Sequence, residues 1–111
     1  MMCSREPVPP EVRALTALLE RRWSLSVLYA AHLGAARFSE FEQALGQVPP
    51  ATLAARLADL ESAGLLERRV LDTRPPRTEY SLSVEGRRLA PLLEALTACS
   101  LDRGRPPRSG H

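Results

Sequence analysis

The sequence predicts a mainly helical α+β fold in which one hairpin of two strands lies among helices. Residues 49–63 carry leucines at helical spacing and stop at a glycine. Residues 65–71 and 78–82 have the composition of two strands joined by a proline-containing loop. Residues 11–34 and 83–100, which flank this unit, carry apolar stripes typical of amphipathic helices. A helix that runs directly into a hairpin favours a recognition helix followed by a wing, so we predict a winged helix-turn-helix with additional N- and C-terminal dimerisation helices.

The length of 111 residues fits one domain with one modest core. Residues 1–10 contain three prolines and are expected to form a flexible N-terminal arm, followed by a folded domain over residues 11–100. Residues 101–111 contain three arginines and no apolar period, which predicts a disordered basic tail. No stretch approaches the roughly 20 apolar residues that span a membrane, and the first ten residues lack the apolar run of a signal peptide. We therefore expect a cytoplasmic protein without a membrane partner.

The N-terminal part of the domain is predicted to form two helices. The first is expected over residues 11–22, and the second runs from Trp23 to a stop at Gly34. Trp23 is the only tryptophan and is expected to anchor the core, while the Ser24 hydroxyl could cap the second helix. The first helix has an apolar inner face formed by Val12, Leu15, Leu18 and Leu19.

The next segment predicts a helix-turn-helix. Ser39 and Glu42 have the spacing of a capping box, which would open a short helix that ends at Gly46. The second helix, over residues 49–63, starts with two prolines, which suit a first turn where no N–H is needed.

The hairpin and the last helix complete the predicted domain. Residues 72–77 contain two consecutive prolines, which cannot donate to a ladder, so we expect a stiff loop between the strands. Ser83 is expected to cap a single last helix that bends at Pro91. One side of this helix carries Leu89, Leu92, Leu93, Leu96 and Cys99. The terminal helices present more apolar surface than one small domain needs, which predicts a homodimer.

These motifs together resemble the HxlR-type winged-helix transcriptional regulators. The resemblance covers about residues 12–99, and its strength lies in the order and spacing of the whole series. The matching motifs are Arg22-Trp23-Ser24-Leu25, Gly34 to Phe41, Glu61-Ser62-Ala63-Gly64-Leu65 and Arg74-Pro75-Pro76-Arg77-Thr78-Glu79-Tyr80-Ser81-Leu82. The resemblance implies a homodimer that binds double-stranded DNA at inverted-repeat operators, and we expect a repressor. Some members of this family respond to oxidants, others to small metabolites.

The chain departs from the thiol-sensing members of this family. They carry a cysteine shortly before the first helix, where this chain has Pro10. Cys3 lies seven residues earlier, and Cys99 stands where the family often has a second tryptophan. We therefore do not expect the usual thiol switch. We expect instead a small apolar ligand near the dimer interface, lined by Trp23, Tyr29 and the last helix.

The second helix of a helix-turn-helix places its N-terminal part in the major groove. Thr52 and Arg56 are the side chains expected to read bases there, because an arginine can bind guanine O6 and N7 together. The other interpretation of Arg56 is a helix residue paired with Asp59 or Glu61. The alanines of this helix can only contact thymine methyl groups.

The wing offers a second set of arginines. Arg74 and Arg77 flank the stiff proline loop, which suits contacts with the phosphate backbone or a narrow minor groove. Arg37, at the entrance to the short helix, is a further candidate for a phosphate contact. The full expected set of DNA-binding residues is Arg37, Pro50, Ala51, Thr52, Ala55, Arg56, Arg74 and Arg77.

No motif indicates catalysis. The chain has no phosphate-binding glycine loop, no cluster of metal ligands and no arrangement of serine, histidine and aspartate expected of a nucleophile. We expect no enzyme, no cofactor and no metal; the lone His32 is expected to be structural. The alternative function is a winged helix that binds a protein or a ligand in place of DNA, which the alanine-rich recognition helix leaves open.

Overall fold

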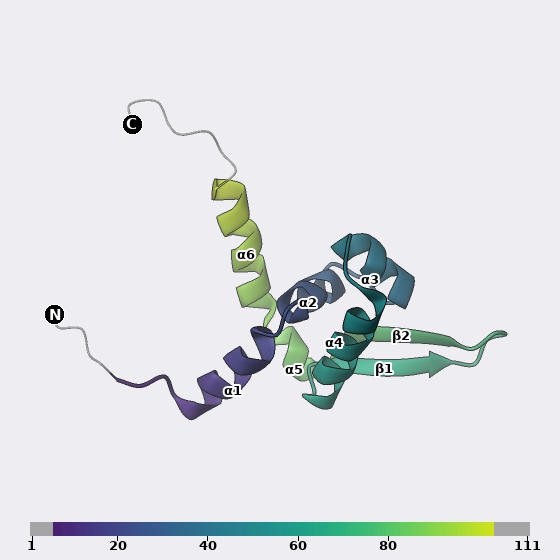
Figure 1. The fold of residues 1–111 in the computed structure, drawn as a ribbon, viewed down its shortest axis with the longest axis horizontal. Helices are drawn as coiled ribbons and strands as arrows, with labels where there is room; N and C mark the ends of the chain where they lie inside the picture. The colour runs from purple at the N-terminus through teal and green to yellow at the C-terminus, as the bar shows by residue number, and fades with distance from the viewer. Residues whose placement is uncertain (1–5, 104–111) are drawn as a thin grey trace, which may run out of the picture.

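The computed structural model describes residues 6–103, which form a winged helix-turn-helix with an additional helix at each end (Figure 1). The elements in chain order are α1 (Pro10–Leu19), α2 (Ser24–His32), α3 (Phe38–Leu45), α4 (Pro50–Ser62), β1 (Leu66–Leu71), β2 (Arg77–Leu82), α5 (Val84–Arg87) and α6 (Ala90–Arg103). The hairpin extends to one side of the molecule, and α1 and α6 extend from the other (Figure 1). The predicted mainly helical fold with a wing is confirmed. No helix in the described range is both long and apolar enough to cross a membrane.

The core lies between α2, α3, α4 and the base of the hairpin. The leucine stripe of α4 is completely buried: Leu53, Leu57 and Leu60 are at most 1% exposed. Phe41 of α3 is also fully buried and meets the ring of Tyr80 edge to face, with 6.3 Å between the ring centroids. Because this stripe fixes the rotation of α4 about its axis, the opposite side of the helix is held outward.

The glycine stop of α4 is confirmed and forms a Schellman motif. Gly64 has a φ of +82°, and its N–H donates to the carbonyl of Glu61 at 3.0 Å. The N–H of Leu65 donates to the carbonyl of Leu60, also at 3.0 Å. Leu65 is buried, so the chain turns back onto the core and enters β1 without a loop.

The hairpin is docked onto the helix-turn-helix by backbone hydrogen bonds. β1 and β2 pair antiparallel, with Leu66 opposite Leu82 and Leu71 opposite Arg77. The N–H of Tyr80 donates to the carbonyl of Ala36, in the linker before α3, at 2.8 Å. This bond ties the wing to the segment that leads into the helix-turn-helix.

The start of α2 differs from the prediction. α1 ends at Leu19, and Trp23 occupies the N-cap position of α2 with a φ of +78°. Ser24 is the first residue inside the helix, fully buried, and its hydroxyl has no hydrogen-bond partner among the described residues, so the predicted Ser24 cap is wrong. Trp23 packs against the core half-buried, and its ring lies 5.5 Å from the guanidinium of Arg22.

The predicted capping box of α3 is also wrong, because this helix begins at Phe38, ahead of the expected N-cap Ser39. The third helical residue is therefore Glu40. Its carboxylate accepts the N–H groups of Ala36 and Arg37 at 2.8 and 3.0 Å. These two backbone hydrogen bonds lower the pKa of Glu40 from its ordinary value of 4.5.

The predicted single last helix is divided into α5 and α6. Pro91 has no N–H to donate to the carbonyl of Arg87, so the helix ends there and restarts at Ala90. α6 continues to Arg103, so the first three residues of the predicted tail are helical. Residues 1–5 and 104–111, which hold the first half of the predicted arm and the remainder of the predicted tail, lie outside the described residues.

Ser83 caps α5 as predicted. Its hydroxyl accepts the N–H of Gly86 at 3.0 Å and donates to the carbonyl of Gly64 at 2.5 Å. Gly86 is buried, and a Cβ at this position would overlap the carbonyl oxygen of Leu65. The end of α4 and the start of α5 are thus held in direct contact.

We predict that Gly86→Ala destabilises the protein, because a backbone oxygen must move to admit the methyl group. Overpacking of this kind costs about 1–3 kcal/mol, which the midpoint of urea unfolding will measure. Glu85→Ala is the matched control, since Glu85 is an exposed neighbour that only pairs with exposed Arg88. Equal midpoints for the two variants would contradict the prediction.

Candidate nucleic-acid interface

The outward side of α4 is a surface of methyl groups. Pro49 is the N-cap and Pro50 the first helical residue. Four alanines three or four positions apart are exposed along this side: Ala51, Ala54, Ala55 and Ala58. A helix with small side chains can approach another surface closely, and its chemistry is restricted to apolar contact.

The two side chains predicted to read bases lie on the flank of this surface. Thr52 and Arg56 are half-buried. The Arg56 guanidinium donates to the Asp59 carboxylate at 2.7 Å, and Asp59 also pairs with Arg21, from the turn between α1 and α2, at 3.0 Å. Arg56 is thus paired with Asp59, one of the two partners named from the sequence, and its contact with DNA stays a prediction. Arg21 was missed, and the sequence carries no signal that would place it beside α4.

The wing presents its arginines at the far end of the hairpin. Arg74 lies in the connecting loop and Arg77 is the first residue of β2; both are exposed. The hydroxyl of Thr73 donates to the carbonyl of Pro75 at 2.8 Å, which orders the loop between them. The tip projects away from α4, so these arginines form a second basic group that is separate from the recognition helix (Figure 1).

Arg37 lies apart from both sets of residues. It is the N-cap of α3 and is half-buried. The predicted DNA-binding residues therefore occupy three places: the outward side and flank of α4, the tip of the wing and the start of α3.

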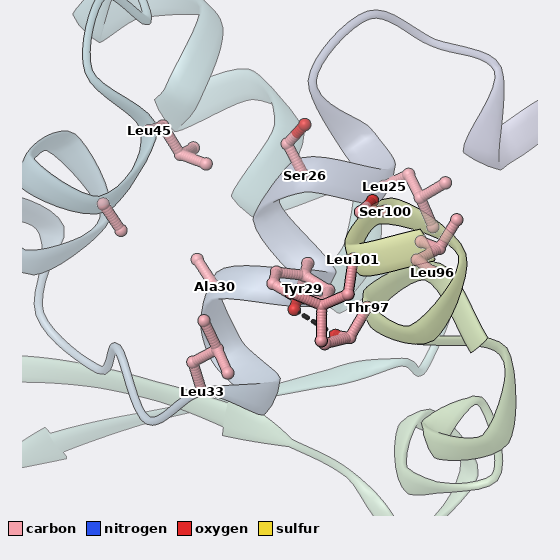
Figure 2. Close-up of a pocket in the computed structure, with 11 residues that line it drawn as sticks. Leu25, Ser26, Tyr29, Ala30, Leu33, Leu45, Leu96, Thr97, Ser100 and Leu101 are labelled. Atoms are coloured by element: carbon pink, nitrogen blue, oxygen red, sulfur yellow. Dashed lines mark hydrogen bonds between the residues drawn. The ribbon is translucent and has the colours of Figure 1, made fainter. Parts of the chain in front are cut away.

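A largely apolar groove lies on another side of the molecule, between α2, α3 and the end of α6 (Figure 2). Its volume is about 620 Å³, within the range of small-molecule sites. Tyr29 forms part of its wall, and its hydroxyl is hydrogen-bonded to that of Thr97 on α6. Trp23, the other predicted ligand residue, is not among the residues that line it. Sequence reasoning also missed Leu25, Leu33 and Leu45, whose apolar character gives no hint of a groove.

Of the two cysteines, only Cys99 lies in the part of the chain that the structure describes. Cys99 is exposed on α6, and Cys3 lies outside the described residues.

Among known protein families, the model of the HxlR-like helix-turn-helix matches residues 18–104 of this chain. YvaP from Bacillus subtilis, an uncharacterized HTH-type transcriptional regulator, is 37% identical over 84 residues, which cover 76% of this chain and 78% of YvaP. The HTH-type regulator sll1512 from Synechocystis is 36% identical over 85 residues; the match covers 77% of this chain and 63% of sll1512, less than two thirds of that relative. The reduced form of the transcriptional regulator YodB from B. subtilis superposes with a TM-score of 0.74 at 25% identity, over 92% of this chain and 100% of that chain.

Proposed function

The chain belongs to the HxlR-like helix-turn-helix family, and we propose that this DNA-binding transcriptional regulator acts as a homodimeric repressor on an inverted-repeat operator. The observation that carries the proposal is the uncovered apolar surface of the two terminal helices, on the side of the molecule away from the wing (Figure 1). The family consists of transcriptional regulators, which are not enzymes, so we propose no catalytic activity for this chain.

The apolar residues of α1 and α6 support the homodimer. α1 has no fully buried residue, and its Val12 is 46% exposed. On α6, Leu93 is buried, whereas Leu92 and Leu101 are 41% and 65% exposed. Apolar surface costs about 25 cal/mol per Å² when it remains in water. Association of two copies through these helices would remove that cost.

The docking of the proposed dimer on DNA follows from helix-turn-helix geometry. α4 would enter the major groove with Pro50, Ala51 and Ala55 against the bases, where alanine methyls contact thymine methyls. Thr52 and Arg56 would act from the flank of the helix. Two copies of α4 related by a two-fold axis would lie roughly 34–36 Å apart, one DNA turn, which requires an inverted repeat.

The remaining arginines would position the protein on the backbone. Arg74 and Arg77 at the wing tip, together with Arg37 at α3, would bind phosphates, which set register without reading sequence. Repression requires only that the bound dimer occupies promoter DNA. A cytoplasmic location follows in a cell whose DNA is not enclosed in a nucleus.

The groove beside Tyr29 is the proposed site of a small apolar signal molecule. α6 contributes Leu96, Thr97 and Leu101 to its wall. Because α6 would also form the dimer interface, an occupant of the groove could change the spacing of the two recognition helices. We propose no redox role for Cys99.

We predict that the protein sediments as a dimer at micromolar concentration. The double variant Leu92→Glu, Leu101→Glu should sediment as a folded monomer, because two charges would have to be buried in the interface. Val70→Glu is the control, since Val70 is 53% exposed but lies on β1. A stable wild-type monomer would contradict the homodimer.

A footprint on the DNA upstream of the protein's own coding region tests the operator. We expect two protected half-sites related by a two-fold axis, with centres about 10–10.5 bp apart or a multiple of it. A promoter–reporter fusion should rise when the protein is removed. Protection of one asymmetric site would argue against the inverted repeat, and a fall in the reporter would argue against repression.

The wing arginines should contribute affinity without specificity. We predict that Arg74→Ala and Arg77→Ala each weaken the binding of operator and scrambled duplexes about equally. Each substitution removes two phosphate contacts per dimer, so the slope of log K against log salt should flatten by about 2. Arg87→Ala on α5 is the control for loss of an exposed arginine elsewhere. A wing variant that loses only its preference for the operator would show that the wing reads sequence.

The groove can be tested with an apolar fluorescent probe such as anilinonaphthalene sulfonate. Ala44 is an exposed lining residue on α3, so Ala44→Trp should obstruct the groove and reduce probe binding by about tenfold or more. Ala58→Trp, on the outward side of α4, should retain probe binding and lose operator affinity. Equal probe binding by wild type and Ala44→Trp would exclude this groove as the site.

A further inference from the structure

One carboxylate oxygen of Asp59 forms ion pairs with two arginines of different elements, and the pair with Arg56 is also a hydrogen bond. The Nη1 of Arg56, three residues earlier on α4, lies 2.7 Å from this Oδ2. The Nη1 of Arg21, from the turn between α1 and α2, lies 3.0 Å from the same atom. Asp59 therefore connects the recognition helix to the N-terminal part of the chain.

This contact holds Arg56 against the body of the protein. The Arg56 side chain is only 21% exposed, and its Nε is buried without a hydrogen-bond partner among the described residues. The outward side of α4 beside it consists of alanine methyls. An arginine in this position must leave Asp59 before its guanidinium can reach a base edge.

We propose that Asp59 determines specificity by competing with DNA for Arg56. The proposal rests on the proposed function, in which α4 enters the major groove. Asp59 is a positioning residue: it holds Arg56 back on random DNA and releases it where a guanine is correctly placed.

The number of hydrogen bonds explains why this competition discriminates between sequences. In its place against Asp59, Arg56 makes one charge-assisted bond and leaves Nε unpaired. A single phosphate oxygen accepts no more hydrogen bonds from Arg56 than the carboxylate does. Binding to nonspecific DNA therefore becomes little more favourable when the phosphate replaces Asp59 as the partner of Arg56. Guanine O6 and N7 accept two bonds from the guanidinium fork, which compensates for the lost ion pair.

Arg21 lowers the free-energy cost of moving Arg56 from Asp59 to a guanine. A carboxylate left unpaired next to phosphates would oppose binding, because both groups are negative. Arg21 already forms an ion pair with the same oxygen, and its side chain is 55% exposed and can adjust. When Arg56 departs, Asp59 keeps a cation partner.

The test compares Asp59→Asn with Glu61→Gln. Both substitutions remove one negative charge from the last turns of α4, but Glu61 is exposed and is not bonded to Arg56. We expect Asp59→Asn to tighten binding to scrambled duplex about tenfold, equivalent to ~1.4 kcal/mol, and to tighten operator binding much less. Glu61→Gln should shift both duplexes by the same small factor. An equal shift of both duplexes by Asp59→Asn would overturn the proposal.

A double-mutant cycle separates the release of Arg56 from a general charge effect. In an Arg56→Ala background, Asp59→Asn should raise the affinity for scrambled duplex no more than Glu61→Gln does. A full gain in that background would mean that Asp59 acts on DNA directly, and the proposal would fail.

Two further variants keep the test decisive if Asp59→Asn unfolds. Arg56→Lys keeps the charge but loses the fork, so it should retain affinity for scrambled duplex and lose most of the preference for the operator. Arg21→Ala should weaken operator binding while leaving scrambled duplex unchanged; an unchanged operator affinity would contradict the role of Arg21. Failure of the proposed function is recognised separately, because wild type would then show no preference for any upstream DNA.

Discussion

The end of α4 is the point on which the geometry of the molecule depends. The chain turns at Gly64, buries Leu65 and enters β1, and the carbonyl of Leu65 accepts the N–H of Ser83 at 3.0 Å. Ser83 in turn bonds to Gly64 through its hydroxyl and caps α5. Gly86 is packed so closely against Leu65 that no side chain fits. The angle between the recognition helix and the wing is therefore set by backbone contacts, which tolerate little adjustment.

This rigid frame separates two kinds of chemistry. The wing holds its arginines in the open, where they can bind phosphates along any sequence. α4 offers methyl groups outward and keeps its only arginine, Arg56, in an ion pair at the flank. In the proposed complex, a recognition helix of this kind would depend on shape and thymine contacts unless the arginine is released. The position of the charges away from the helix face would then limit attraction to random DNA.

The terminal helices and the groove join the proposed dimer surface to the recognition helix. α2 lies against α6 on one side and against α3 and α4 on the other. The hydroxyls of Tyr29 and Thr97 bridge α2 and α6 at the groove (Figure 2). On the other side, Asp59 of α4 reaches Arg21, which directly precedes α2. A change in the packing of α6 thus has a continuous path of contacts to α4.

The sequence by itself determined the order of the elements, since leucine spacing, glycine stops and the proline loop are local signals that tertiary structure did not override. The stripe of α4, the Gly64 turn and the Ser83 cap were predictable for this reason. The caps of α2 and α3 were misplaced, because the N-cap positions are taken by Trp23 and Arg37, which lie outside the usual capping residues, and packing decides where each helix starts. The pairing of Asp59 with Arg21 and the walls of the groove were decided by tertiary structure alone. Each joins residues far apart in the chain, and no local pattern records which side chains will meet.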